Sequence, residues 1–373
     1  MTSGRGLVLG WGPPEQQDAP FLERLWPAVL DGAVKGRGLS VNVDVLTAVL
    51  EESARDCLNT RRRRDELVAA LSPVVDAADD PVEAANKVVE AALEYHTQQL
   101  AGNGGVCRLG KFHNVLYVAA TMAVTHEAQD SGVVAALLAA FHKCEGGLDR
   151  LIGPALLGPR ISRLLSASQP DMDTSQEARS RLEYFLGHAR AAQLTLPQPG
   201  GPPLSMLEAP LPTLQGAGPL YTAVQAGEEA TVLLLLQHGA KPVLGGQCCP
   251  LLLAVTRLST HTRATLSQCP PCLCPYYPCI CLLKYPIDYP PQDIAVLRLL
   301  LRAAGGYCIP NHPDLLHPRL LMDSVLPSEP PRLTHWARYS LRTALAAAWA
   351  LPKGTATLSL PLTMLPFMDL VTD

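Results

Sequence analysis

Five cysteines lie close together in the C-terminal half of the chain and could bind a metal ion. Their spacing is C-x2-C-x-C-x4-C-x-C, and prolines stand among them (Cys269, Cys272, Cys274, Cys279 and Cys281). Four thiolates at short spacing can surround one zinc ion. Common zinc modules supply their ligands from two separated pairs, however, and this segment lacks that arrangement. We therefore interpret it as a reduced surface loop and expect no metal and no cofactor, with a zinc-binding protein as the alternative.

Two other patterns could carry chemistry, but each is incomplete. Gly105 and Lys111 have the G-x4-G-K spacing of a phosphate-binding loop, yet Phe112 follows where such a loop needs a magnesium-binding hydroxyl. His142 and Cys144 are near each other without an evident third residue to orient them, which favours a packed helix end. The motifs H-E-x-x-H and G-x-S-x-G do not occur in the sequence. We expect no catalytic residues, and therefore not an enzyme.

The composition bounds the class of protein. The 373 residues are 48% hydrophobic and 17% charged, which is enough to bury two or three compact units. A net charge of −4 gives no electrostatic reason to expect a nucleic acid partner. No segment has about 18 uninterrupted apolar residues, so we expect no membrane span. The 11 cysteines, an odd number, favour free thiols in the cytoplasm, with the nucleus as a second location.

The elements that must position any site are predicted to be helices. Apolar residues recur at helical spacing from Val45 to Leu58, and Asp80 and Thr174 each precede a helix start of the capping type. No stretch alternates at period two for long enough to indicate a sheet. The expected fold is all-α, with an irregular helical region over residues 1–195. Residues 196–214 are rich in proline and are interpreted as a linker.

The segment from Gly218 to Ala240 carries the most informative spacing in the chain. It resembles an ankyrin repeat, whose consensus is T-P-L-H-x-A-A, then G, then V-x-x-L-L, then G-A. The glycine between the two expected helices permits a tight reversal, because positive φ is easy only for glycine. The residues that match are Pro219, Leu220, Ala223, Gly227, Leu235, Leu236 and Gly239.

One repeat cannot bury its own faces, so neighbouring repeats are expected. A second repeat begins at Cys249 and is completed only by the helix from Ile294 to Ala304, which leaves a Cys/Pro-rich insertion near 257–292 within the repeat region 215–306. A degenerate ankyrin-like hairpin is predicted near 113–143. The predicted repeat stack is therefore short and irregular.

The C-terminal residues contain two apolar blocks. The first is an amphipathic helix with Leu333, Trp336, Ala337 and Leu341 on one face. The second contains Leu358, Leu360, Pro361 and Met364. In this order at 329–371 they resemble a SOCS box, and with the repeats the chain resembles the ankyrin repeat and SOCS box family. It departs from the family's pattern, because Ala337 replaces a cysteine, Arg332 replaces a small residue or proline, and Ser359 replaces a proline.

The resemblance implies a function. In that family the first block binds elongin C, which is paired with elongin B, and the second favours cullin-5. The resemblance therefore assigns elongin binding to the face of the first block and cullin binding to the second, while the repeats bind an unknown substrate protein. The expected function is that of a substrate adaptor in a ubiquitin ligase. The alternative is an ankyrin interaction scaffold without a ligase link, whose tail is only a structural cap.

Overall fold

The computed structural model describes residues 61–109, 112–166, 172–243, 249–267, 289–305 and 332–372, and most of them are helical. The expected helix at 45–58 and the five-cysteine segment lie outside the described residues. No described helix has both the length and the apolar character that a bilayer crossing requires.

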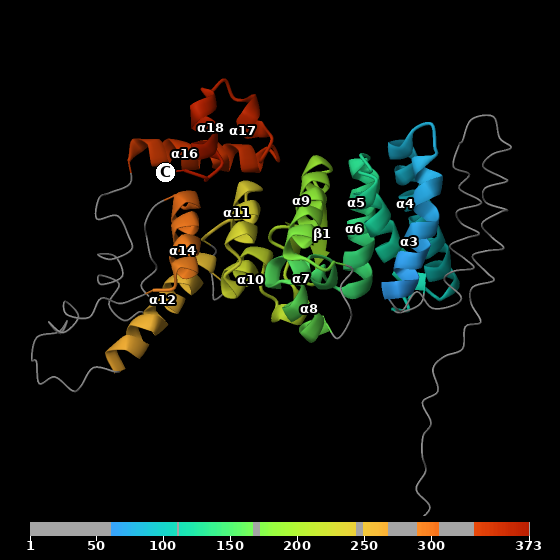
Figure 1. Ribbon diagram of the computed structural model, residues 1–373, viewed down its shortest axis with the longest axis horizontal. Coiled ribbons are helices and arrows are strands. Elements are labelled where there is room, and N and C mark those ends of the chain that lie inside the picture. The colour runs from blue at the N-terminus through green and yellow to red at the C-terminus, as the bar shows by residue number, and fades with distance from the viewer. Residues whose placement is uncertain are drawn as a thin grey trace, which may run out of the picture.

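The helices form successive pairs that stand side by side in a row (Figure 1). In one layer α10 packs between α7 and α12, and α3 packs against α5. In the second layer, α6 lies between α4 and α9, and α11 packs on α14. A single hydrophobic core runs along the row between the two layers. The bounds are α3 (Arg61–Asp76), α4 (Pro81–Gly102), η1 (Phe112–Asn114), α5 (Val115–Thr125), α6 (Ser131–Glu145), α7 (Asp149–Leu157), α8 (Pro159–Ser166), α9 (Ser175–Ala191), α10 (Pro219–Ala226), α11 (Glu229–Gln237), α12 (Pro250–Ser267) and α14 (Pro291–Ala303).

The predicted helix starts at Asp80 and Thr174 are confirmed. The Asp80 carboxylate accepts hydrogen bonds from the backbone N–H groups of Val82 and Glu83, both at 3.0 Å. Thr174 and Glu177 form a reciprocal capping box at the start of α9. Both arrangements satisfy N–H groups that have no partner inside a helix.

The residues that were matched to the ankyrin consensus form a helical hairpin, α10 and α11. The glycine between the helices, Gly227, has a φ of +74° and its N–H closes the last turn of α10. Gly239, after α11, also has a positive φ of +96°. Apolar side chains from both helices enter the shared core, namely Leu220, Ala223, Leu235 and Leu236.

The interpretation of residues 196–214 as a linker without a sheet is corrected by the structure. Strands β1 (Thr195–Gln198) and β2 (Gly201–Ser205) form an antiparallel hairpin, followed by a short 3-10 helix, η2 (Pro212–Leu214). A two-stranded ribbon has two open edges, so its prolines need not donate to a ladder. Leu196, Met206 and Leu211 are buried and attach the segment to the core.

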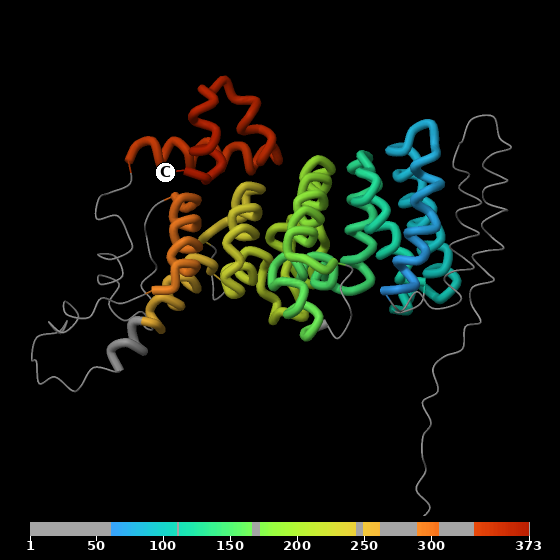
Figure 2. Tube along the Cα trace, in the orientation of Figure 1, coloured from blue at the N-terminus to red at the C-terminus, as the bar shows by residue number. Residues whose placement is uncertain are grey.

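The C-terminal residues 332–372, here called the tail, form a separate small unit of four helices (Figure 2). They are α16 (Leu333–Ala347), α17 (Gly354–Thr357), η3 (Leu362–Met364) and α18 (Leu365–Met368). α17 and α18 fold back on α16, and η3 packs on α18. The tail lies across the ends of α11 and α14, at the opposite end of the row from α3 and α4 (Figure 1).

Candidate functional site

The tail docks on the row through polar side chains of α16. The buried residues of this helix are His335, Arg338 and Arg342, which we call the docking ridge. They are spaced three and four residues apart and therefore lie on one face of the helix. This face meets the ends of α11 and α14, where backbone carbonyls have no partner inside their own helices.

Arg342 makes the strongest of these contacts. Its guanidinium donates to the carbonyls of Leu236 at 2.5 Å and Gln237 at 3.4 Å, at the end of α11, and to the carbonyl of Met368 at 2.7 Å. A positive charge at a helix C-terminus also complements the helix dipole. Burial lowers the pKa of Arg342 to about 10, so the group stays protonated at neutral pH.

His335 and Arg338 form a connected pair beside it. Arg338 donates to Nδ1 of His335 at 3.2 Å, so the other ring nitrogen, Nε2, carries the hydrogen and donates to the carbonyl of Ala304 at 2.8 Å. The guanidinium of Arg338 also lies 4.2 Å from the centre of the Phe367 ring and holds α18 in place.

Residues of the row contribute to the same contact, among them Arg302 of α14, which donates to the carbonyl of Leu370 at 3.3 Å. Arg190 of α9 donates to the carbonyl of His238 and, at 3.5 Å, to that of Ala346 in α16. The side-chain amide of Gln237 donates to the carbonyl of Asp369 at 3.0 Å. The tail is thus held on the row by hydrogen bonds to backbone carbonyls, together with Leu370, which is buried in the shared core.

The predicted apolar face of α16 points away from the row. Leu333 is 87% exposed, Trp336 46% and Leu341 39%, and Ala337 is also exposed. We call these four residues the outward face. The alternative in which Leu333 packs on the last helix pair as part of a cap disagrees with its exposure. A helix normally buries its apolar stripe. Because α16 buries its polar side instead, its exposed apolar side chains form a surface suited to a partner, and we call this arrangement the inversion of α16.

The second apolar block is partly packed against the protein and partly exposed to solvent. Leu358 and Leu360 are half-buried, whereas Pro361 and Met364 are exposed and Leu362 is 82% exposed. Downstream of the block, Met368 and Leu370 are buried and anchor the chain end. The exposed part of the block therefore continues the apolar surface of the tail.

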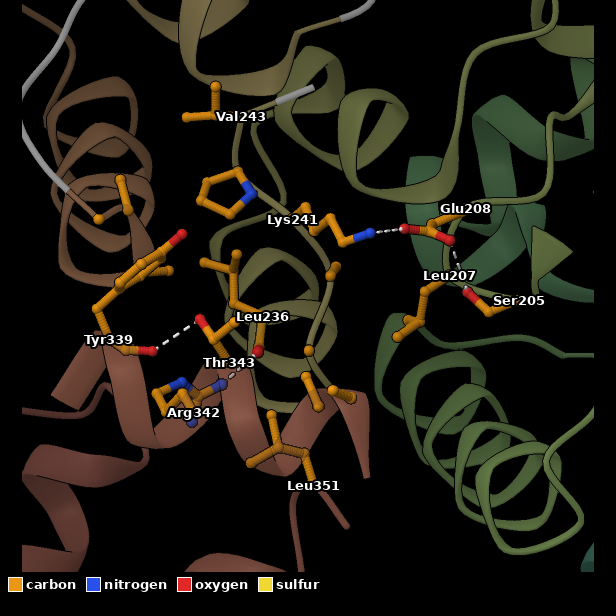
Figure 3. A pocket seen from close by; sticks show the side chains of 18 of the residues that line it. Ser205, Leu207, Glu208, Leu236, Lys241, Val243, Tyr339, Arg342, Thr343 and Leu351 are labelled. Carbon is orange, nitrogen blue, oxygen red and sulfur yellow. Dashed lines mark hydrogen bonds and ion pairs between the residues drawn. The ribbon is translucent and has the colours of Figure 1, made fainter. Parts of the chain in front are cut away.

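A pocket of about 590 Å³ opens where the tail meets the row (Figure 3). Leu236, Tyr339, Arg342 and Leu351 line it from the tail side and from α11. On the far side, Lys241 and Glu208 form an ion pair at 2.6 Å. The pocket is a recess beside the docking contact, separate from the outward face.

A second group of chemically capable side chains lies at the other end of the row. His96 of α4, Cys107 of the following loop, His113 of η1 and Cys144 near the end of α6 have donor atoms within 4.8 Å of one another. We call these residues the Cys2His2 cluster. The sequence does not predict this cluster, and the pattern around Cys144 favours only a packed helix end. The ligand spacing, x10, x5 and x30, follows no common module, so only the fold brings these residues together.

The electrostatics of the cluster distinguish its two thiols. Burial opposes ionisation of both. Hydrogen bonds from His113 and His96 nevertheless lower the pKa of Cys144, whereas burial and the neighbouring Cys144 raise the pKa of Cys107. The cluster therefore favours one thiolate over two as long as no further positive charge is present.

Comparison of the chain with known proteins gives no family assignment. No protein-family model, curated protein or solved structure matches it.

Proposed function

We propose that this chain is the substrate-recognition adaptor of an elongin B/C–cullin-RING ubiquitin ligase. In this proposal the helix pairs are ankyrin-type repeats that bind a target protein, and the tail is a SOCS box. The outward face binds elongin C, and Leu358, Leu360, Pro361 and Met364 contact cullin-5.

The observation that carries the proposal is the inversion of α16. Its docking ridge is polar and buried, while Leu333 is 87% exposed. Side chains that project from a helix at this spacing are suited to insertion into a groove on another protein. The same leucine is the first position of the block that resembles the elongin-binding motif. Exposure and motif position therefore coincide at one residue.

The repeat part of the proposal rests on the α10–α11 hairpin. Gly227, with its φ of +74°, stands where the ankyrin consensus has glycine. The row formed by neighbouring helix pairs provides the extended surface on which repeat proteins bind their partners. A target held on this surface would be brought near the conjugating enzyme that the cullin carries. The chain itself would perform no chemistry, because its contribution is proximity.

The experiment that tests the proposal is co-purification of the full chain with the elongin B/C pair. We expect wild-type protein to capture elongin B/C, and Leu333→Asp to abolish capture, because a carboxylate buried in an apolar pocket without a partner costs several kcal/mol. Thermal stability of the variant should stay close to wild type, since the side chain already faces water.

Leu164→Asp is the matched control, because Leu164 is 82% exposed on α8, far from the tail. It should leave both elongin capture and stability unchanged. If wild-type protein captures no elongin B/C at micromolar concentration, the ligase hypothesis fails and the scaffold alternative stands. A large loss of stability in Leu333→Asp would instead show that Leu333 packs within its own chain.

A further inference from the structure

The Cys2His2 cluster joins three parts of the N-terminal half that are distant in the sequence. His96 and Cys144 are 3% exposed and half-buried, respectively, and come from two helices that pack together. Cys107 and His113 lie in the connection from α4 to α5, after Gly104 and Gly105, which have positive φ. In this connection Val106 is 63% and Leu109 47% exposed, whereas Phe112 is buried.

The distances between donor atoms fit a tetrahedral metal ion. The sulfur of Cys107 is 3.4 Å from Nε2 of His96 and 3.5 Å from Nδ1 of His113, and the sulfur of Cys144 is 3.5 Å from Nε2 of His96. A tetrahedral zinc site with bonds of about 2.3 Å to sulfur and about 2.0 Å to nitrogen holds its ligand atoms roughly 3.3–3.8 Å apart. These three separations lie in that range, and all four donor atoms are within 4.8 Å of one another.

The surroundings of His113 match those of a metal ligand. Its Nδ1 faces the cluster, while its Nε2 lies 2.7 Å from a carboxylate oxygen of Glu145. The same oxygen accepts a hydrogen bond from the hydroxyl of Tyr117 at 2.6 Å. A carboxylate on the far nitrogen fixes the orientation and tautomer of a ligating histidine. An ordinary ion pair between His113 and Glu145 would not require two thiols and a second imidazole on the other side of the ring.

We propose that His96, Cys107, His113 and Cys144 bind one zinc ion, which fastens the connection between α4 and α5 to the end of α6. Two thiolates balance the charge of Zn²⁺, so the metal with its four ligands carries no net charge, which lowers the cost of burying it. The thiol protons leave to solvent when the metal binds. Sulfur and imidazole donors in a tetrahedral set select zinc over magnesium or calcium, which prefer oxygen. Four protein ligands leave no open position, so the site is structural and not catalytic.

The test is the zinc content of the full chain after dialysis against a weak chelator, measured by elemental analysis. We expect about one zinc per wild-type chain and close to none in Cys107→Ser/Cys144→Ser, because serine hydroxyls are poor zinc ligands. Cys249→Ser, which changes a buried thiol at the start of α12, should keep the metal.

The five-cysteine segment is a second potential source of zinc, so it needs its own variant. Replacement of its five cysteines by serine should leave about one zinc per chain if the metal occupies the Cys2His2 cluster. Zinc lost in this variant and retained in Cys107→Ser/Cys144→Ser would overturn the assignment. A disulfide between Cys107 and Cys144 in place of metal, or no zinc in wild-type protein, would also overturn it.

Two further variants keep the proposal falsifiable if the serine variants fail to fold. His96→Cys should retain zinc, because three cysteines and one histidine form an equally common structural site. Glu145→Gln should weaken zinc affinity about 10- to 100-fold, measured by competition with a chelating dye, because it removes the charge that orients His113. Unchanged affinity in Glu145→Gln together with metal loss in His96→Cys contradicts a zinc site at this position.

Discussion

The guanidinium of Arg342 joins the tail to the end of α11 and, within the tail, joins α16 to the end of α18. Arg342→Met keeps most of the side-chain volume but removes this donor from the carbonyls of Leu236 and Met368, of which Leu236 keeps the N–H of Gly239. Hydrogen bonds to charged groups contribute about 1.5–3 kcal/mol each, so we expect the tail to detach more readily. Limited proteolysis would show faster cleavage within the tail. Arg298→Met, on the exposed side of α14, should leave the cleavage rate unchanged. Equal protection in both variants would contradict docking through Arg342.

His238 should make stability depend on pH. Burial, with a smaller contribution from the charge of Arg190, lowers its pKa from 6.5 to about 4. Between these values the unfolded chain binds a proton that the folded chain does not, so stability falls as the pH falls through this window. The free energy of unfolding should decrease by up to about 3 kcal/mol between pH 6.5 and 4.

The measurement is denaturant unfolding at several pH values for wild type and His238→Gln. The variant should show a shallower slope, corresponding to about one proton fewer taken up on unfolding. His142 and His188 also have pKa values lowered by burial, so some slope should remain. An unchanged slope in the variant would show that His238 does not titrate in this range.

At individual residues, the sequence predicted the apolar stripe of α16, and the resemblance implied that Leu333 on this stripe faces a partner. Periodicity alone leaves open whether such a stripe packs on its own chain or on another protein. It does not predict that His335, Arg338 and Arg342, on the other side of the helix, are buried. The Cys2His2 cluster offered no comparable signal, because its members span 48 residues and meet only through packing.

At the scale of elements, the turn between α10 and α11 depends on the conformation of Gly227. A Cβ there would meet only the Arg257 guanidinium, 3.7 Å away, so space is available and the backbone is the constraint. A left-handed conformation costs other residues about 1–2 kcal/mol, and a β-branched side chain is the least tolerant. Gly227→Val should lower the free energy of unfolding by at least this amount in chemical denaturation.

Gly227→Asn is the matched control, because asparagine adopts positive φ more readily than valine. It should lose clearly less stability. Equal losses in the two variants would mean that the added atoms, and not the backbone conformation, are responsible.

Helix starts that depend on residues adjacent in the sequence were predictable. The starts of α4 and α9 follow from side chains that bond to nearby backbone N–H groups, and those groups are adjacent in sequence. The β1–β2 hairpin was not predicted, because proline content is a signal for irregular backbone. Leu196 of β1 and Met206, directly after β2, are buried and attach the hairpin to the core, which is a tertiary effect.

At the scale of the whole molecule, each helix pair contacts mainly its neighbours, as in other repeat-like rows. The Cys2His2 cluster and the tail therefore lie at opposite ends and have no direct contact (Figure 1). Repeat spacing predicted the α10–α11 hairpin and parts of two other helix pairs, α5 with α6 and α12 with α14. The contact of α7 with α9 was not predicted. In the sequence, α8 and residues 167–171 separate these two helices, so their spacing departs from that of an ankyrin repeat.

The exposed apolar side chains of the tail also determine what happens to a copy of the chain that is bound to no other protein. Leu333 and Leu362 are more than four-fifths exposed, and apolar side chains presented in this way promote self-association. Cellular chaperones and proteases act on such surfaces. An unassembled copy is therefore a substrate for removal. Under the proposed function, the abundance of the chain would follow the supply of elongin B/C, and overproduction of the adaptor alone would raise turnover before it raised the amount of ligase.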